Sequence, residues 1–579
     1  MLLIWLSLFA AIILALTIAT LVAHPRNTPL WLVILIIAVA SALLVFPLVV
    51  FVRWLNCWRN FRRLLVGLAI FVTLPAILVT EENWRGKRAW DNYRRTAEAR
   101  GERFDLASLV PPVPDDQNFF CATIVAEALD QIRKDGSDHS GQANYRLNFN
   151  IYRGDSKDWP PSSGYWLKGT LTDLKQWQTY FRTFNATPEG QTNGFPIAAS
   201  LQSPAADVLL ALSGFNPALE LLRQASLRPS ARIPLNYENG FETASELLPW
   251  LANMKRCAQF LELRILAELD NGQSDAALAD VKLLFRVTDC VRQQPFLISQ
   301  LVRIAMTAIA LQPIYEGLAQ HRWSDAQLAN LEQMLAQRDY LADFEFAMKG
   351  ENMTAIATFE KQRLTRESKQ WEEHSGTNRL VSISYRFMPS AYFYQNELAF
   401  AHMHEQYILP LVDQIHRTVA PAALPVEANN AIEVGIHGMV APATLRQAQA
   451  AIKSELKHYN PYKIQAQMFF PAVAASVKKF AMIQSQVDLA SVACALERFR
   501  LAHGNYPDAL DALAPRFITQ LPHDLINGQP LHYRRTDDGK FCLYSVGWDE
   551  KDDGGKVLFT KGGSVDREKG DWVWQYPAK

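Results

Sequence analysis

The first 80 residues contain no lysine, aspartate or glutamate, so very little charge interrupts their apolar character. Their charged side chains are five arginines: Arg26, Arg53, Arg59, Arg62 and Arg63. Of the 58 basic residues of the chain, 53 therefore lie in 81–579, against all 58 acidic residues, which gives this part a net charge of −5. Phosphate binding requires clustered Lys and Arg, which a mildly acidic body does not supply. The composition thus argues against a nucleic-acid partner.

The chain also lacks the short motifs of common catalytic and nucleotide-binding sites. It contains no GxSxG, no Walker-type loop and no GxGxxG followed by a helix. The segment AHMHEQYI approaches the zinc motif HExxH, but Ile408 stands where that motif has its second histidine. His402 and His404 are two residues apart and would point to different sides of a helix. A zinc site there is therefore not expected.

The cysteines and one polar cluster have structural explanations. The six cysteines show no CxxC or other zinc-like spacing, and isolated cysteines in apolar stretches such as SVACAL are usually small buried hydrophobes. The polar cluster in FYQNELAF comprises Gln395, Asn396 and Glu397. A helix cap or a buried, hydrogen-bonded asparagine explains this cluster better than catalysis does.

Three apolar runs at the start of the chain predict transmembrane helices. Leu2–Val22 and Leu30–Val52 have the length of roughly 20 residues that crosses a hydrocarbon core, and Leu64–Val79 is shorter but free of charge. Backbone groups in lipid must be paired internally, so each run should be helical. A cleaved signal peptide is the alternative for the first run. That run lacks a positively charged start, and a second span follows within a few residues, which favours three spans.

The arginines predict the orientation of these spans. The loop RWLNCWRNFRR, residues 53–63, carries four arginines and two tryptophans, a composition typical of the cytoplasmic interface. The N-terminus should then be cytoplasmic, and everything after Thr80 should lie on the other side. In a bacterium this is an inner-membrane protein, held in the lipid bilayer, with most of its chain in the periplasm.

The remaining chain is predicted to be mainly α-helical. Residues 81–117 form a charged helical stem that closes on the Pro-rich LVPPVPDDQNF, and 118–465 form a mainly helical body with a few strands. Within the body, YRLNFNIYRG (145–154) alternates like a strand, whereas DLKQWQTYFRTF and most of 205–347 have helical periodicity. The apolar stretch 294–314 is interrupted by Arg303, so it is expected to be a buried core helix. Residues 419–443 should form an irregular loop.

The last segment, 466–579, predicts a long helix on a small antiparallel sheet. The helix should run from about Phe469 through His503, because Gly504 ends it and Pro507 prevents its resumption. Three strand candidates follow in PLHYRR, KFCLYSV and KVLFT, and the turn TDDG joins the first two as a hairpin. This is an α+β unit.

Three ordered stretches of this unit resemble the major pseudopilin of bacterial type II secretion systems. They are ERFRLAHGNYP, LPHDLINGQPLHY and LYSVGWDEKDDGG, within roughly residues 480–560. In that family the closing loop holds a calcium ion. The start of this chain, MLLIWLSLFAAI, lacks the prepilin cleavage and methylation signal with its Glu. The resemblance therefore implies a module reused on another protein, without packing through an N-terminal pilin helix.

The resemblance makes Asp549, Asp552 and Asp553 the candidate calcium ligands. Calcium takes six to eight oxygens, and closely spaced aspartates beside glycines supply both charge and turn freedom. A solvated acidic turn explains the same residues, and both interpretations stay open here.

The outer body as a whole resembles a group of large, uncharacterised, membrane-anchored bacterial envelope proteins. WDNYRRTAEARGERFDL, SPAADVLLAL and FMPSAYFYQNELA carry this resemblance, which implies no activity. The leading hypothesis is a non-enzymatic envelope scaffold that contacts a partner protein. The alternatives are a membrane-anchored hydrolase with a site assembled from distant residues, and a peptide- or glycan-binding module. A pocket with convergent polar groups and shifted pKa values would favour an alternative.

Overall fold

The computed structural model describes residues 50–54, 56–134, 146–155, 157, 159–160, 164–237, 241–365, 387–421 and 464–577. The chain divides into two compact units, Met1–Arg85 and Gly86–Lys579. The predicted spans Leu2–Val22 and Leu30–Val52, apart from the last three residues of the second, lie outside the described residues. So does the predicted loop 419–443 after its first three residues.

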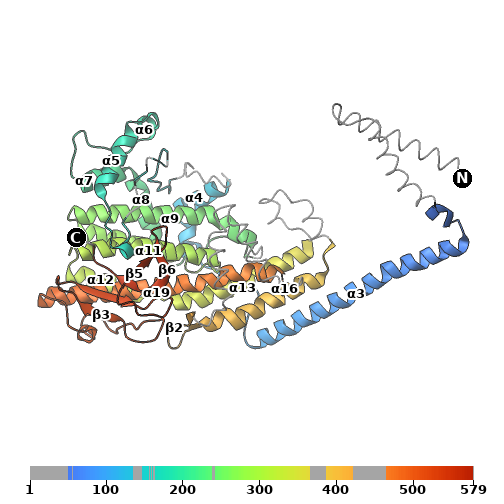
Figure 1. Cartoon of the computed structure of the whole chain (residues 1–579). Helices are drawn as coiled ribbons and strands as arrows, with labels where there is room; N and C mark the ends of the chain where they lie inside the picture. Colours follow the sequence, from blue (N-terminus) through green and yellow to red (C-terminus); the bar gives the residue numbers. More distant parts are fainter. Residues whose placement is uncertain are drawn as a thin grey trace, which may run out of the picture. The chain divides into compact units, whose positions relative to one another are not determined.

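Helix α3, Trp58–Ala99, contains the third predicted span and continues into the predicted stem (Figure 1). Three helical stretches of the described chain are long and apolar enough to cross a membrane: Trp58–Ala99, Pro204–Ser226 and Leu297–Ala319. The second and third carry many buried residues, whereas the apolar window of α3 has none. Membrane anchoring is therefore compatible with the structure, and α3 is the stretch whose apolar side chains are left exposed.

The second unit is mainly helical, as predicted. Its α-helices are α4 (Thr123–Lys134), α5 (Leu174–Asn185), α6 (Pro188–Asn193), α7 (Pro204–Leu212), α8 (Asn216–Ser226), α9 (Phe241–Asp270), α10 (Ser274–Asp289), α11 (Leu297–Ala319), α12 (Asp325–Ala336), α13 (Tyr340–Thr365), α16 (Ser390–Met403) and α19 (Ile464–His503). Short 3₁₀ turns lie at Leu106–Leu109, Asp115–Gln117, Phe119–Cys121, Trp166–Lys168, Ser213–Phe215, Leu409–Leu411 and Leu510–Leu513, and a π-helical turn lies at His404–Ile408.

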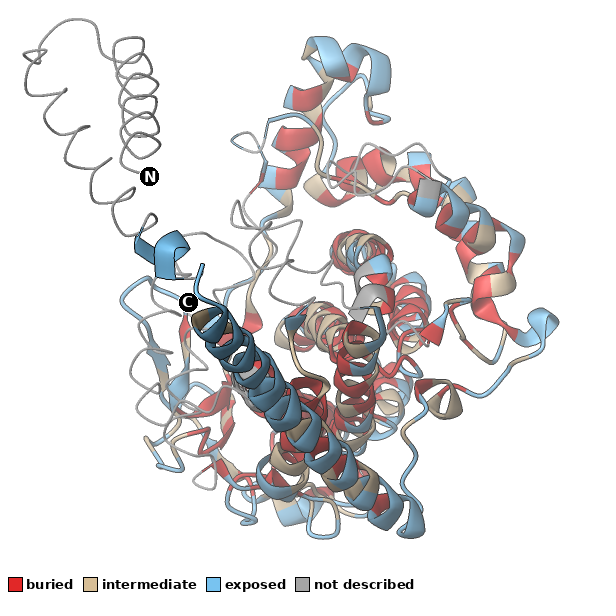
Figure 2. Ribbon diagram, turned by 90° about the vertical axis from the view of Figure 1, so that its right-hand side faces the viewer, coloured by how far each residue is buried: buried red, intermediate tan, exposed pale blue. Residues whose placement is uncertain are grey.

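The long helices pack side by side around a large hydrophobic core. Helix α11 lies against α9 on one side and α19 on another, while α13 contacts both α16 and α19 (Figure 1). Figure 2 shows that buried residues concentrate in these central helices. The predicted core helix is α11, and its Arg303 is fully buried. This confirms that the apolar stretch 294–314 belongs to the body.

Local sequence accounts for several helix boundaries. Ser324 and Gln327 form a capping box at the start of α12, which satisfies backbone donors that a helix leaves unpaired. Gly272, with φ of 75°, separates α9 from α10 in the turn DNGQ. Gly350 lets α13 approach the backbone of Pro295, since a Cβ there would lie 1.7 Å from the Pro295 carbonyl oxygen.

The C-terminal part has the predicted combination of a long helix and a small sheet. Strands β3 (His532–Arg535), β4 (Phe541–Ser545) and β7 (Trp572–Trp574) form an antiparallel sheet in the order β3-β4-β7. The β3–β4 hairpin turns at TDDG, as predicted. Strands β5 (Val557–Phe559) and β6 (Val565–Gly570) pair separately. Trp574 lies 5.1 Å from Trp166 between ring centroids, so this sheet shares its core with the helical body.

The predicted strand at 145–154 is wrong. Leu147, Phe149 and Ile151 are buried and their neighbours are more exposed, as in a strand, but residues 146–154 pair with no strand among the described residues. The alternation therefore reports an extended segment with one face against the core. Burial of one face is enough to select this pattern, because side chains of any extended backbone alternate.

Candidate functional site

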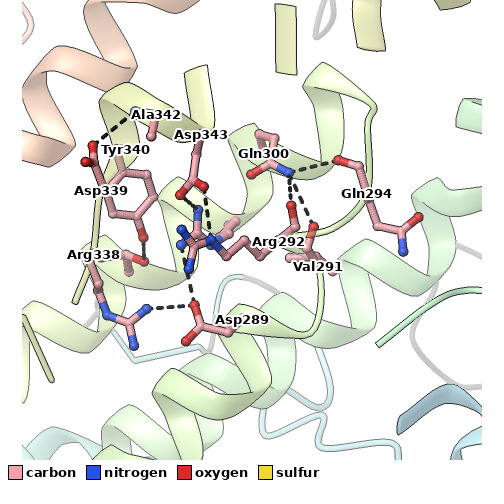
Figure 3. A network of polar contacts seen from close by, with 12 residues as sticks. Asp289, Val291, Arg292, Gln294, Gln300, Arg338, Asp339, Tyr340, Ala342 and Asp343 are labelled. Carbon is pink, nitrogen blue, oxygen red and sulfur yellow. Dashed lines mark hydrogen bonds and ion pairs between the residues drawn. The ribbon is translucent and has the colours of Figure 1, made fainter. Parts of the chain in front are cut away.

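A buried polar network lies where α10, α11 and α13 meet (Figure 3). Arg303 of α11 is fully buried, and its Nη1 lies 2.5 Å from Oδ2 of Asp343. Its Nη2 lies 3.4 Å from Oδ1 of Asp289, which Arg338 approaches to 2.7 Å. The Arg303 guanidinium also lies 4.5 Å from the ring centroid of Tyr340. Because each buried charge has an opposite charge beside it, this network fixes the relative positions of the three helices.

Burial and charge act against each other within this network. Burial alone would raise the pKa of Asp289, but the neighbouring arginines, Arg338 foremost, outweigh it and lower that pKa. Figure 3 shows the Arg338 side chain extended toward Asp289. The guanidinium charge of Arg338 is thereby neutralised inside the body.

A pocket of about 400 Å³ adjoins this network. It is bounded by α12, the start of α13, the middle of α19, the loop 518–525, and the hairpin of β1 (Val412–Asp413) and β2 (Thr418–Val419). The backbone N–H of Val419 donates to the Leu525 carbonyl at 2.7 Å, which ties the hairpin to the loop. The charged and titratable side chains that line the pocket are Glu332, Arg338, Asp339, Arg417, Asp488 and His523.

Asp339 and Arg417 form one ion pair of the pocket wall. Oδ2 of Asp339 accepts from Nη1 of Arg417, while its Oδ1 accepts from the backbone N–H of Ala342 at 3.0 Å and caps α13. Arg417 adopts a left-handed φ of 52° in the hairpin turn, a conformation that few residues other than glycine adopt. The ion pair therefore joins the hairpin to the start of α13.

Asp488 is the acidic group of α19 that faces this pocket. Its Oδ1 accepts from Nε2 of Gln484 at 2.9 Å, and the Oε1 of this glutamine accepts from the backbone N–H of Tyr340 at 2.7 Å. In the part of the chain that the structure describes, Oδ2 of Asp488 has no hydrogen-bond partner. Burial raises the pKa of Asp488 to about 7, despite the Gln484 hydrogen bond and the charge of Arg417.

The three predicted calcium ligands lie in the loop between β4 and β5. Oδ1 of Asp552 accepts from the Tyr544 hydroxyl at 3.0 Å and from the Gly554 N–H at 2.8 Å. Asp549 makes two long contacts of 3.4 Å, to the backbone N–H groups of Lys551 and Gly570. Among the described residues no group of three or more His, Cys, Asp or Glu side chains is arranged to hold a metal ion. The structure thus places Asp549, Asp552 and Asp553 on one loop without gathering their carboxylates.

Sequence reasoning missed Asp571, which organises this loop. Asp571 is 3% exposed, and its carboxylate accepts from the backbone N–H groups of Asp553 (3.2 Å), Gly555 (2.6 Å) and Lys556 (3.2 Å). Burial raises the pKa of Asp571 in opposition to these hydrogen bonds. Asp571 lies outside the acidic stretch, beside the tryptophans of β7, so the sequence carries no pattern that links it to the loop.

The two histidines near HExxH point apart, as expected. His402 lies with its ring centroid 4.8 Å from that of Tyr93, whereas His404 is buried against Phe400. Burial lowers the pKa of His404 to about 3, so this imidazole is uncharged at neutral pH. Glu405 pairs with Arg100 at 3.0 Å.

The polar cluster 395–397 contains the buried, hydrogen-bonded asparagine that the sequence predicts. Asn396 donates to the Tyr392 carbonyl at 2.8 Å and accepts from the Ala466 N–H at 3.0 Å. All six cysteines are unpaired, and Cys257, Cys290 and Cys494 are buried. Neither feature supplies an activated nucleophile.

Comparison with known proteins identifies no relative of this chain. No protein-family model matches the chain, and no curated protein or solved structure shows significant similarity to it.

Proposed function

We propose that this protein is a non-enzymatic, membrane-anchored binding protein of the bacterial envelope, and that its body takes up a small polar ligand. The observation that carries the proposal is the pocket beside the Arg303 network. Charged side chains reach it from α12, the α12–α13 link, α19, the β1–β2 hairpin and the loop 518–525. Convergence of polar groups from several elements on one concavity is typical of ligand sites.

The internal contacts of the pocket favour binding over hydrolysis. Nε2 of His523 donates to the Arg417 carbonyl at 3.2 Å. Ser491 and Thr519 also line the pocket, but no hydrogen bond among the described residues joins either hydroxyl to His523. A nucleophilic serine or threonine requires an adjacent base. A hydrolase therefore has less support than a binding protein, and the envelope partner inferred from the sequence stays a prediction.

A substitution that fills the pocket tests this proposal. Ala336 is an exposed residue at the end of α12 that lines the pocket, so Ala336→Trp should obstruct it without disturbing the core. Ala326, exposed at the other end of α12, is the matched control as Ala326→Trp. We expect that a panel of amines, amino acids, dicarboxylates and sugars contains a compound that raises the melting temperature of the full-length protein in detergent. That increase should disappear in Ala336→Trp and persist in Ala326→Trp.

Two results would contradict the pocket as the functional site. One is a panel in which no compound raises the melting temperature. The other is an increase of equal size in Ala336→Trp, since it would place the binding elsewhere.

The proposed orientation places the N-terminus in the cytoplasm and residues after Thr80 in the periplasm. It is supported by the arginines of the loop 53–63. Alkaline phosphatase fused after Thr80 should be active, because this enzyme folds in an oxidising compartment. A fusion after Asn60, inside the basic loop, is the control and should be inactive. Activity only in the second fusion would reverse the topology.

We also propose that Asp549, Asp552 and Asp553 bind calcium, and the sequence of the loop supports this. Calcium that binds the folded state alone should raise the melting temperature once its concentration exceeds the dissociation constant. The double variant Asp549→Ala, Asp552→Ala should lose this increase. Asp537→Ala, Asp538→Ala in the β3–β4 turn is the control. An unchanged melting temperature in the parent protein would reject the calcium site.

A further inference from the structure

The carboxyl groups of the pocket differ in how their oxygens are used. Both oxygens of Asp339 are engaged, one by Arg417 and one by the N–H of Ala342. Asp488 uses only Oδ1, in its bond with Gln484. Glu332 has no hydrogen bond or ion pair in the described part of the chain, and burial raises its pKa. The acceptor atoms left for a ligand therefore belong to Asp488 and Glu332.

The two arginines of the pocket wall do not balance these carboxyl groups. Arg417 is directed to Asp339 by its ion pair. Arg338 is directed to Asp289 and lies 4.1 Å over the ring of Phe285, and its Nε is fully covered. Glu332 faces the charge of Arg498, and each arginine of the pocket wall already has its own carboxylate. The unmatched charge of the pocket is therefore negative when Asp488 is ionised.

The rest of the lining selects among cations. Leu335, Leu341, Ile518, Leu521 and Leu525 supply apolar walls. A hard divalent cation requires six or more oxygens, and no group of three or more acidic, His or Cys side chains suited to a metal occurs among the described residues. The ligand must therefore bind one carboxylate oxygen and contact apolar walls. An ammonium group on a hydrocarbon chain does both, because its nitrogen donates to a carboxylate while its methylenes contact leucines.

We propose that this pocket binds a small alkylammonium ion, with its nitrogen on Oδ2 of Asp488 and its carbon chain against Leu341, Leu521 and Leu525. The inference rests on the proposed binding function and assigns its ligand class. Gln484, which is 1% exposed, holds Asp488 in place through Oδ1 and is itself fixed by the Tyr340 N–H. The acceptor atom is therefore positioned before the ligand arrives.

Binding should be coupled to the release of a proton. Because burial raises the pKa of Asp488 to about 7, the carboxyl group is largely protonated at pH 5.5. An ammonium ion favours the carboxylate, so binding below pH 7 exchanges the proton of Asp488 for the ligand. The groups that face Asp488 are Glu332 from α12, Asp339 and Arg417 across the pocket, and His523 and Asp524 from the loop. Affinity should therefore rise from pH 5.5 to 7.5.

The test uses putrescine, a four-carbon diamine, with 1,4-butanediol and succinate as neutral and anionic analogues of the same length. Binding to the full-length protein in detergent is measured by titration calorimetry at pH 5.5 and 7.5. We expect putrescine to bind more tightly at pH 7.5 and the two analogues not to bind. Asp488→Asn should weaken putrescine binding at least tenfold at pH 7.5 and abolish its pH dependence. Since asparagine has the size of aspartate and Asp488 is only partly buried, this variant should fold.

The controls separate the ligand class from the pocket itself. Glu345→Gln, an exposed acid on α13 outside the pocket, should bind putrescine like the parent protein. Putrescine affinity that is unchanged in Asp488→Asn would overturn the proposal. Binding of succinate or butanediol in place of putrescine, blocked by Ala336→Trp, would overturn the ammonium assignment and retain the binding function. If no compound of the wider panel binds either, the proposed function also fails.

Discussion

Replacing Asp343 with alanine is expected to lower the free energy of unfolding by about 3–5 kcal/mol, because it leaves a buried arginine without its closest carboxylate. Arg303 is fully buried, and its Nη1 lies 2.5 Å from Asp343. Asp289 lies 3.4 Å from the other nitrogen and is shared with Arg338, so it cannot compensate fully. Urea unfolding of the full-length protein in detergent, followed by tryptophan fluorescence at pH 7, measures the change.

Two further variants separate the buried pair from ordinary ion pairs. Glu345→Ala removes a partner of Lys349 on the same helix, where both side chains are about half exposed, and should cost less than about 1 kcal/mol. Arg303→Met combined with Asp343→Leu should recover most of the lost stability, because apolar residues of similar volume replace a buried charge pair at little cost. Equal losses in Asp343→Ala and Glu345→Ala would contradict the role assigned to Asp343.

Features of the fold that depend on residues close together in the sequence could be predicted from it. The helix ends at Gly272 and Gly504 and the β3–β4 turn at TDDG each follow from a few consecutive residues whose backbone preferences agree. The burial of 294–314 was likewise predictable, since an arginine within an apolar helix requires a partner inside a protein. The wrong prediction of a strand at 145–154 also came from a local pattern. Alternation specifies which side chains are buried, but a strand also needs a second strand, which no local pattern supplies.

The candidate site could not be predicted, because its parts are distant in sequence. The pocket joins Asp339, Arg417 and Asp488, and the choice of these three over the other acids and arginines depends on how α13, the hairpin and α19 pack. Asp488 is held through Oδ1 by Gln484, one helical turn earlier, and this glutamine is held in turn by the backbone N–H of Tyr340, which lies far away in sequence. Asp571 follows the same rule, since its importance comes from three N–H groups at least 15 residues away.

Replacing Glu397 with glutamine is expected to stabilise the protein at pH 8 and to leave its stability almost unchanged at pH 4. Glu397 is 1% exposed, and its Oε1 has no hydrogen-bond partner. Nε of Arg363 lies 4.0 Å from this oxygen. Burial raises the pKa of Glu397 to about 8, and the charge of Arg363 offsets this only in part.

The direction of the effect follows from proton binding. An unfolded glutamate has a pKa of about 4.3, so at pH 8 the unfolded chain has lost this proton while the folded chain still holds much of it. Stability therefore falls as the pH rises from about 4 to about 8. Below pH 4 both states are protonated and the contribution vanishes. Glutamine, which cannot ionise, should remove a penalty on the order of 5 kcal/mol at pH 8.

Melting temperatures of the parent protein, Glu397→Gln and Glu345→Gln between pH 4 and pH 8 measure this effect. Glu345 is the control because its side chain is 45% exposed and its removal deletes a carboxylate without relieving burial. The curve of Glu397→Gln should be flatter than that of the parent, though not flat, since burial also raises the pKa values of Glu268 and Glu351 to about 7. Parallel curves for the parent and Glu397→Gln would show that this carboxyl group ionises as readily in the folded protein as in the unfolded chain. Its burial between α13 and α16 would then carry no cost, and the offset from Arg363 would have to be complete.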